Sequence, residues 1–141
     1  MLAGMSLRAA QAQAAGVVLD ARTGKLLDSR RLDEASRFLA APGSTLKPLI
    51  LSSLLEAGRL RVHDAFPCSG KLAIDGRSFA CVHPRMITPV DVPTAIAYSC
   101  NEYVAHAVER WKPGEQLSAL RRWGLSSRTN LDATEVIGRL Q

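Results

Sequence analysis

The chain has 141 residues, of which 47% are hydrophobic and 5% aromatic. This length fits one domain, and the apolar content suffices for a folded core, which excludes a disordered chain. The 18 Lys and Arg residues exceed the 13 Asp and Glu residues, giving a net charge of +5. The basic residues form no continuous stripe and few aromatic residues accompany them, so we expect no nucleic-acid partner.

The first fifteen residues are rich in alanine, and residues 12–14 read Ala-Gln-Ala. That triplet is typical of a signal-peptide cleavage site, although a complete signal peptide has a longer apolar run with basic residues before it. We therefore expect residues 1–15 to be a clipped signal peptide or a disordered leader, and residues 16–141 to be the domain. Since no stretch approaches about 20 apolar residues, any membrane association would come from a segment outside this chain.

Two short β-favouring runs follow, at residues 16–20 and 25–29, and Ala-Arg-Thr-Gly at 21–24 separates them. Gly24 suits a turn position that needs a positive φ, so the pattern predicts a β-hairpin. A lone hairpin is marginally stable in water, and this one must therefore rest on helices or on further strands. Residues 31–40 show no regular periodicity, and we expect them to be irregular.

A Pro-Gly break at residues 42–43 precedes a long apolar run. Its spacing predicts a helix from Ser44 to Ala57, ended by Gly58. The positions that we expect to face the core recur at intervals of three and four residues: Leu46, Leu49, Ile50, Ser53, Leu54 and Ala57.

Ser44 lies on the first turn of this predicted helix, and Lys47 lies three residues further on. Residues three apart share one helix face, with Cβ atoms about 5–6 Å apart, so the lysine amine and the serine hydroxyl can meet. A lysine made neutral by burial can take the hydroxyl proton. The pair is therefore a candidate nucleophile, Ser44, with its base, Lys47.

Residues 61–90 are rich in glycine and proline and predict a long ordered loop with short strands. The twelve residues between Cys68 and Cys81 fit a closed disulfide loop, but the same spacing also fits two free thiols. We expect the third cysteine, Cys100, to be a small apolar residue packed behind a loop. No Cys-x-x-Cys occurs and the histidines share no ligand spacing, so we expect no metal: these histidines are His63, His83 and His106.

Three further helices are predicted in the second half of the chain. The first begins in Thr-Pro-Val-Asp at 88–91, which looks like an N-cap with proline at N1, and runs through Ala97. The second spans 102–111, and the third spans 115–123. The turn between the first two carries Ser99 and Asn101 in a Ser-x-Asn triplet.

Two of these segments together resemble a known family. Residues 41–48 read Ala-Pro-Gly-Ser-Thr-Leu-Lys-Pro and residues 99–101 read Ser-Cys-Asn, wording similar to that of the transpeptidase domain of penicillin-binding proteins. Residues 16–27 resemble the first hairpin of that family, and the Trp-Gly-Leu at 123–125 resembles its helix end. The resemblance implies an α+β fold, in which an N-terminal β-hairpin accompanies a helical subdomain.

The resemblance also implies roles for four residues. Ser44 would attack the carbonyl of a D-Ala-D-Ala peptide bond or of a penicillin, and Lys47 would take the serine proton. Ser99 would relay a proton to the leaving amine, and Asn101 would hold the substrate backbone and the lysine. The implied partners are peptidoglycan stem peptides and β-lactams, in the periplasm or elsewhere in the cell envelope, with no cofactor.

The third motif of the resembled family, Lys-Thr-Gly, does not occur after Asn101, and the nearest triplet, Arg-Thr-Gly at 22–24, lies in the predicted hairpin turn. We therefore expect the N-terminal portion of a D,D-transpeptidase domain, lacking the C-terminal strands and having low or no activity. Whether the chain is an enzyme stays open at this point. The alternatives are a β-lactamase or β-lactam sensor domain, and a non-catalytic binding or scaffold domain of the same fold.

Overall fold

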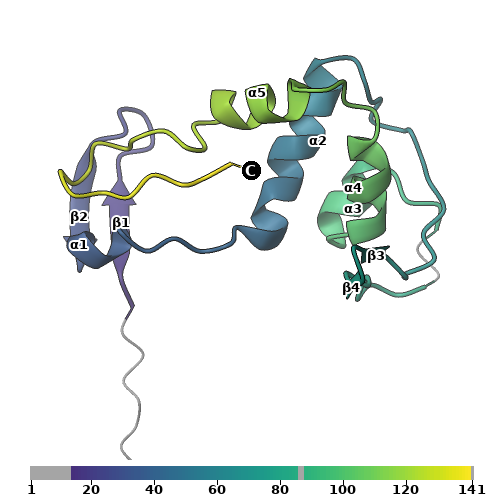
Figure 1. Ribbon diagram of the computed structural model, residues 1–141, viewed down its shortest axis with the longest axis horizontal. Coiled ribbons are helices and arrows are strands. Elements are labelled where there is room, and N and C mark those ends of the chain that lie inside the picture. The colour runs from purple at the N-terminus through teal and green to yellow at the C-terminus, as the bar shows by residue number, and fades with distance from the viewer. Residues whose placement is uncertain (1–13, 86–87, 141) are drawn as a thin grey trace, which may run out of the picture. The chain divides into compact units, whose positions relative to one another are not determined.

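The computed structural model describes residues 14–85 and 88–140, and these form two compact units (Figure 1). The first unit contains residues up to 39 together with residues 128–137, and the second contains the rest of the described chain from residue 40 onward. The predicted leader, residues 1–15, lies outside the described residues except for its last two.

The first unit is built on the predicted hairpin. Strand β1 (Gly16–Leu19) pairs antiparallel with strand β2 (Leu26–Arg30), with a bulge between Val18 and Leu19. In the connecting turn the carboxylate of Asp20 accepts backbone N–H groups from the next residues. Gly24 adopts a φ of 71°, which a residue with a Cβ rarely does. The hairpin prediction is therefore confirmed, including its turn glycine.

The stretch after the hairpin differs from the prediction. Helix α1 (Leu32–Ala35) forms where an irregular segment was expected. Two contacts then join the stretch after α1 to residues 128–137: Arg37 Nε donates to Thr134 Oγ1 at 3.2 Å, and Val136 N donates to Ser36 O at 2.9 Å. Because such contacts come from a distant part of the sequence, local periodicity does not reveal them.

The second unit is organised around helix α2 (Leu46–Glu56), which continues directly from a 3₁₀ turn, η1 (Gly43–Thr45). The helix ends as predicted. Gly58 has a φ of 64°, Arg59 N donates to Leu54 O at 2.9 Å, and Gly58 N donates to Leu55 O at 3.0 Å. These two bonds form the Schellman arrangement, which satisfies the last carbonyl groups of a helix.

The buried face of α2 agrees with the predicted one in part, at Ser53 and Leu54. The buried residues are Lys47, Leu51, Ser53 and Leu54, whereas Ala57 is exposed. Helices α3 and α4 pack against the face that contains Lys47, and this lysine finds hydrogen-bond acceptors there. The apolar pattern alone did not assign a charged residue to the core.

Helix α3 (Val92–Ala97) begins directly after residues 88–91, so the prediction that Pro89 is its first residue is wrong. Its N-cap is Asp91, whose carboxylate accepts Thr94 N at 3.0 Å. Val90 is still extended because it forms an antiparallel bridge with Phe66 through two backbone hydrogen bonds of 2.8 and 2.9 Å. The predicted end at Ala97 is confirmed.

Helices α4 (Asn101–Val108) and α5 (Glu115–Arg122) also form where helices were expected, although α4 ends three residues early. Both pack on α2, as does α3. The Trp123 indole donates from Nε1 to Ser53 Oγ at 2.8 Å, which fixes the end of α5 against α2.

Residues 61–90 are an ordered loop, as predicted, over their described part. The loop contains one small hairpin of strands β3 (Ala73–Ile74) and β4 (Arg77–Ser78). The fold is thus mixed α+β. Among the described residues, every helix is too short or too polar to cross a membrane.

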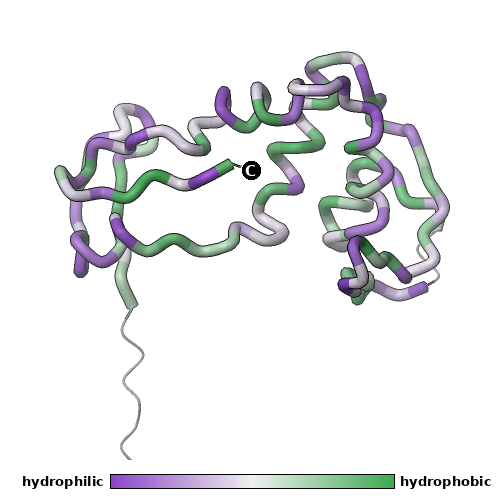
Figure 2. Tube along the Cα trace, viewed as in Figure 1, coloured by the Kyte–Doolittle hydropathy of each residue, from purple (hydrophilic) through white to green (hydrophobic). Residues whose placement is uncertain are grey.

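The core of the second unit lies between α2, α3 and α4, and Figure 2 shows the hydrophobic stretches of α2 that supply part of it. Its largest side chain is Tyr103, which is almost completely buried. The buried residues of this core are Leu51, Leu54, Leu60, Val90, Val92, Ala95, Cys100, Tyr103, Val104 and Ala107.

Candidate active site

Lys47 occupies the first turn of α2, and its side chain points into the second unit with only 8% of its surface exposed. Its Nζ donates to Ser99 Oγ at 2.8 Å, to the Ser99 carbonyl at 2.5 Å and to Asn101 Oδ1 at 2.5 Å. The fold therefore brings together three of the predicted site residues, although more than fifty positions separate Lys47 from the other two.

The surroundings of Lys47 have opposing effects on its charge. Burial is the largest effect and lowers the pKa of Lys47, whereas negative charge at Cys81 and Cys100 acts in the opposite direction. The net pKa is below the ordinary lysine value. A neutral lysine amine is what proton abstraction from a hydroxyl requires.

Ser99 lies between α3 and α4 in an unusual backbone conformation. Its φ of 52° is in the left-handed region, which residues other than glycine seldom adopt. In this conformation both the carbonyl and the hydroxyl of one residue reach Lys47. Strain of this kind persists where the surrounding structure compensates for it, and it is found most often at functional sites.

Asn101, the first residue of α4, joins the lysine to the long loop. Its Oδ1 accepts from Lys47, and its Nδ2 donates to the carbonyl of Phe79 at 2.9 Å and to that of Ala80 at 3.3 Å. Both ends of the amide are thus used, which orients the side chain and ties the loop to the Lys47 site.

Ser44, the predicted nucleophile, is exposed in the 3₁₀ turn η1, directly before α2. No hydrogen bond from its hydroxyl is found among the described residues, so the expected contact with Lys47 is not made here. Hydrogen bonds of catalytic groups are often long in free enzymes and tighten only with substrate. The position of Ser44, one turn from Lys47, remains compatible with the predicted role.

Glu102 connects the long loop to α4, and the sequence analysis did not single it out. Its carboxylate accepts Ser69 N at 2.9 Å, Gly70 N at 3.0 Å and Ser69 Oγ at 3.0 Å. Burial raises the pKa of Glu102, but hydrogen bonds from Ser69 and Cys68 outweigh this effect and the net pKa is lowered. The only feature of the sequence that could have pointed to Glu102 was its position directly after Asn101.

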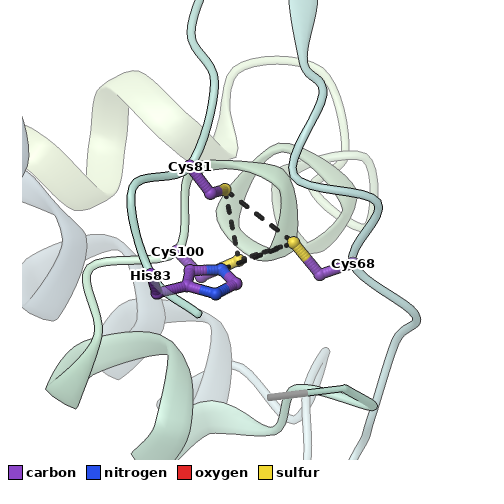
Figure 3. Close-up of side chains that lie close together, drawn as sticks. All are labelled: Cys68, Cys81, His83 and Cys100. Carbon is purple, nitrogen blue, oxygen red and sulfur yellow. Dashed lines mark hydrogen bonds between the residues drawn. The ribbon is translucent and has the colours of Figure 1, made fainter. Parts of the chain in front are cut away.

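The three cysteine thiols are unbridged and lie close together (Figure 3). Cys68 Sγ is 3.8 Å from Cys81 Sγ, and the predicted disulfide between them stays a prediction. Cys100 is fully buried, in keeping with a small packed residue, but its Sγ also lies 3.7 Å from Cys81 Sγ and 3.5 Å from Cys68 Sγ.

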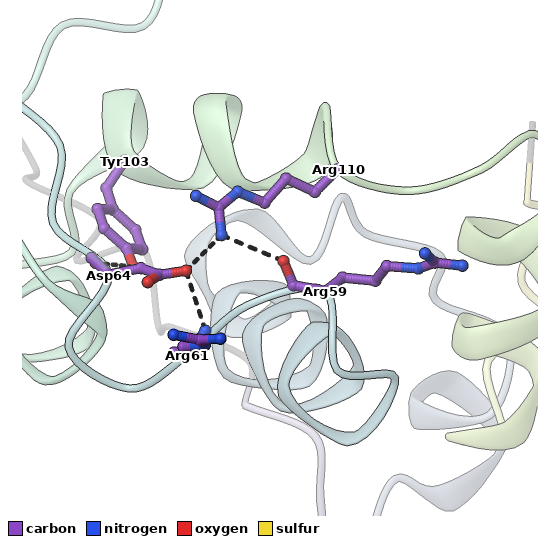
Figure 4. Close-up of polar contacts among 5 residues, drawn as sticks. All are labelled: Arg59, Arg61, Asp64, Tyr103 and Arg110. Atoms are coloured by element: carbon purple, nitrogen blue, oxygen red, sulfur yellow. Dashed lines mark hydrogen bonds and ion pairs between the residues drawn. The ribbon is translucent and has the colours of Figure 1, made fainter.

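A separate polar cluster holds the start of the loop against α4 (Figure 4). Arg110 forms an ion pair with the Asp64 carboxylate and donates to Arg59 O at 3.1 Å. Its guanidinium also lies 5.0 Å from the centre of the Phe66 ring. Tyr103 donates from its hydroxyl to Asp64 O at 2.8 Å. These contacts fix the first residues of the loop next to α4.

A hollow of about 410 Å³ elsewhere in the second unit does not include the Lys47 site. Its lining includes Ser53, Trp111 and Ser118, from α2, the stretch after α4, and α5. None of the predicted catalytic residues contributes to it, so its size alone gives no reason to place the chemistry there.

The comparison with protein families gives the identity of the domain. A family model described as the penicillin binding protein transpeptidase domain matches residues 14–139 of the 141-residue chain. The chain therefore belongs to the penicillin-binding protein transpeptidase family, which confirms the resemblance inferred from the motifs. No curated protein matches the chain.

Proposed function

We propose that the chain carries the serine-acylating part of a peptidoglycan D,D-transpeptidase, with Ser44 as the nucleophile and Lys47 as its base. The observation that supports this most strongly is the buried Lys47 ammonium, held by Ser99 and Asn101. A solvated surface lysine would need none of these contacts. Family membership supports the same assignment.

The hydrogen bonds of Lys47 suggest how it becomes a base. An ammonium has three N–H donors, and all three acceptors around Nζ are provided by Ser99 and Asn101. Loss of one proton leaves two donors and one lone pair on Nζ, and burial favours that neutral form. The lone pair can then accept the proton of Ser44 Oγ.

In the proposed reaction, Ser44 Oγ bonds to the carbonyl carbon of the penultimate D-Ala while its proton moves to Lys47 Nζ. The carbon–nitrogen bond to the terminal D-Ala then breaks while Ser99 passes its hydroxyl proton to the departing amine and takes from Lys47 Nζ the proton that came from Ser44. An amine from a neighbouring stem peptide attacks the resulting ester and releases Ser44. A β-lactam would acylate Ser44 in the same way, but its opened ring would stay attached.

The 141 residues supply only part of what acylation requires. The backbone N–H of Ser44, at the start of a helical segment, can serve as one oxyanion donor. In the family, the Lys-Thr-Gly strand provides the second donor and a cation for the substrate carboxylate, and this sequence does not contain that triplet. Because loss of one oxyanion donor costs roughly 10²–10³ in rate, we expect slow acylation of these residues by themselves.

Peptidoglycan stem peptides and β-lactams are the partners that this chemistry implies, and the proposed location is outside the cytoplasm. The net charge of +5 is compatible with an anionic cell wall. The exposed position of Ser44 leaves it accessible to a large substrate.

The test uses a fluorescent penicillin and two chains: the 141-residue chain and a version extended in the reading frame to the next Lys-Thr-Gly. The extended chain should be labelled stoichiometrically and the short chain slowly, and Ser44→Ala should abolish both. Ser52→Ala, on the same helix, is the matched control and should change neither rate.

The same experiment separates the alternatives. Label that is lost from the extended chain within minutes would indicate a β-lactamase, and a long-lived label with no stem-peptide turnover would indicate a sensor. An extended, folded chain that takes up no label would show a non-catalytic domain. Fast labelling of the short chain would show that the Lys-Thr-Gly strand is dispensable.

A further inference from the structure

Four side chains with metal-binding atoms converge beside the Lys47 site, in the second unit. They are Cys68, Cys81, His83 and Cys100, and their ligand atoms all lie within 4.8 Å of one another (Figure 3). The first three come from the long loop, whereas Cys100 directly precedes α4. Three thiols and one imidazole form a donor set that zinc prefers.

The spacing of these atoms fits a single tetrahedral ion. Ligand sulfurs about 2.3 Å from a tetrahedral zinc lie about 3.8 Å from one another. The three Sγ–Sγ distances here are 3.5, 3.7 and 3.8 Å, and Cys68 Sγ lies 3.5 Å from His83 Nε2. A disulfide would bring two sulfurs to about 2.05 Å and would leave the third thiol and the imidazole unexplained.

The imidazole of His83 has the orientation that a metal ligand needs. Its Nδ1 lies 3.1 Å from the Pro84 carbonyl, so Nδ1 carries the proton and donates it there. The lone pair is then on Nε2, the nitrogen that faces Cys68 Sγ. A backbone carbonyl that fixes the tautomer of a ligand histidine is a common feature of zinc sites.

Backbone hydrogen bonds hold the cysteines in place before any ion binds. Cys81 N donates to Gly70 O at 3.1 Å, and the same glycine donates its N–H to Glu102 at 3.0 Å. The Sγ of Cys100 caps α4 by accepting Tyr103 N at 3.4 Å. The three thiols therefore belong to segments whose positions are set by contacts with α4.

We propose that Cys68, Cys81, His83 and Cys100 bind one Zn²⁺ ion. With four protein ligands the site is closed, so the ion has a stabilising role and takes no part in catalysis. Cys100 stands between Ser99 and Asn101, the two residues that hold Lys47. The ion thereby fastens the long loop to the Ser-x-Asn triplet and keeps the acceptors of Lys47 in position.

The proposal departs from the sequence expectation of no metal, which depended on the absence of Cys-x-x-Cys. Here the ligands occur as Cys81-x-His83 and two distant cysteines. Only the fold of the loop brings them together.

Metal content of the reduced 141-residue chain, dialysed against metal-free buffer, tests the proposal. We expect about one zinc per chain for the wild type and a markedly lower zinc content for Cys81→Ser. For His83→Ala we expect the affinity for zinc to be lower by at least about tenfold. His63→Ala is the matched control, because His63 is exposed and no hydrogen bond of its side chain is found among the described residues. It should keep the full zinc content.

Cobalt(II) titration of the wild type provides a measurement that does not depend on a variant folding. A tetrahedral site with three thiolates gives intense visible bands and thiolate-to-cobalt charge transfer, which we expect to saturate at one equivalent. Absence of these bands in the reduced wild type would overturn the proposal. So would a zinc content equal to that of Cys81→Ser, or complete Cys68–Cys81 disulfide formation in protein isolated with its metal complement.

Discussion

Two polar clusters meet at residues 99–101 and are built in different ways. The Lys47 cluster uses residues on or next to helices, and each partner of the ammonium is a protein atom. The cysteine–histidine cluster takes three of its four members from a loop, and its ligand atoms all lie within 4.8 Å of one another. The first cluster is complete with hydrogen bonds among protein atoms, whereas the second brings together a donor set that suits a metal ion.

The two clusters are joined by three consecutive residues, Ser99, Cys100 and Asn101. Ser99 and Asn101 bind the lysine, while Cys100 points toward the other thiols. The alternation of these side chains explains how one short turn serves both sites. Anything that loosens one cluster should therefore be detectable in the other, and the predictions below examine that link.

The largest effect is expected for Lys47→Met in the chain extended to the Lys-Thr-Gly motif. Methionine fills a similar volume but cannot accept the Ser44 proton, so labelling by fluorescent penicillin should slow by about 10²–10⁴. An unchanged labelling rate would show that Lys47 is not the base.

The pH dependence of the labelling rate should identify Lys47 in a second way. Below its pKa the lysine is protonated and cannot act as a base, so the rate should rise about tenfold per pH unit and level off above the pKa. Because burial lowers the pKa of Lys47, the midpoint should fall below the ordinary lysine value. A midpoint at or above that value would contradict the assignment. Stopped-flow fluorescence across the pH range measures it.

Asn101→Ala tests the link between the two clusters, and its expected effect is of intermediate size. The change removes the acceptor for Lys47 and the donor to the carbonyls of Phe79 and Ala80. Since these groups are partly solvent-accessible, we expect a loss of about 1–2 kcal/mol in the free energy of unfolding. Urea denaturation measures this loss, and metal analysis should show weaker zinc retention because the neighbouring Cys81 is less firmly held.

Asn101→Asp is the companion variant. It keeps an acceptor for Lys47 but places a carboxylate beside the two loop carbonyls, so it should weaken the loop contact alone. If both variants retained zinc as the wild type does, the two clusters would be independent, and the proposed link between them would be wrong.

The sequence predicted more of the Lys47 cluster than of the cysteine–histidine cluster, and the reason is physical. Ser44 and Lys47 are spaced for one helix face, and a helix repeats regularly, so their relation follows from position in the chain. The hairpin and the end of α2 at Gly58 were predictable because β-favouring runs and turn residues are also local features of the sequence. The long loop has no repeat, and the meeting of Cys68 with Cys100 depends on distant contacts such as those of Glu102.

The apolar pattern of α2 did not predict the burial of Lys47, for a related reason. A lysine counts as polar in any apolar pattern, and its burial becomes favourable only where acceptors compensate for the lost water. Those acceptors come from Ser99 and Asn101, about fifty residues away in the sequence. The apolar pattern of α2 did not indicate this centre, whereas the family resemblance had implied that Asn101 holds the lysine, and the structure contains that hydrogen bond.

The smallest effect concerns the backbone of Ser99. Its positive φ costs a residue with a Cβ roughly 1–2 kcal/mol, and glycine avoids most of that cost but loses about 0.5–1 kcal/mol to the freedom of the unfolded chain. The free energy of unfolding of Ser99→Gly should therefore be about 0.5–1 kcal/mol higher than that of Ser99→Ala. Both variants lack the hydroxyl, so both should be labelled slowly in the extended chain.

Ser118, inside helix α5, is the matched control. At this position the glycine variant should be less stable than the alanine variant by about 1 kcal/mol, which is the opposite order. An order of stability at position 99 that matched the order at position 118 would show that the left-handed turn carries no strain.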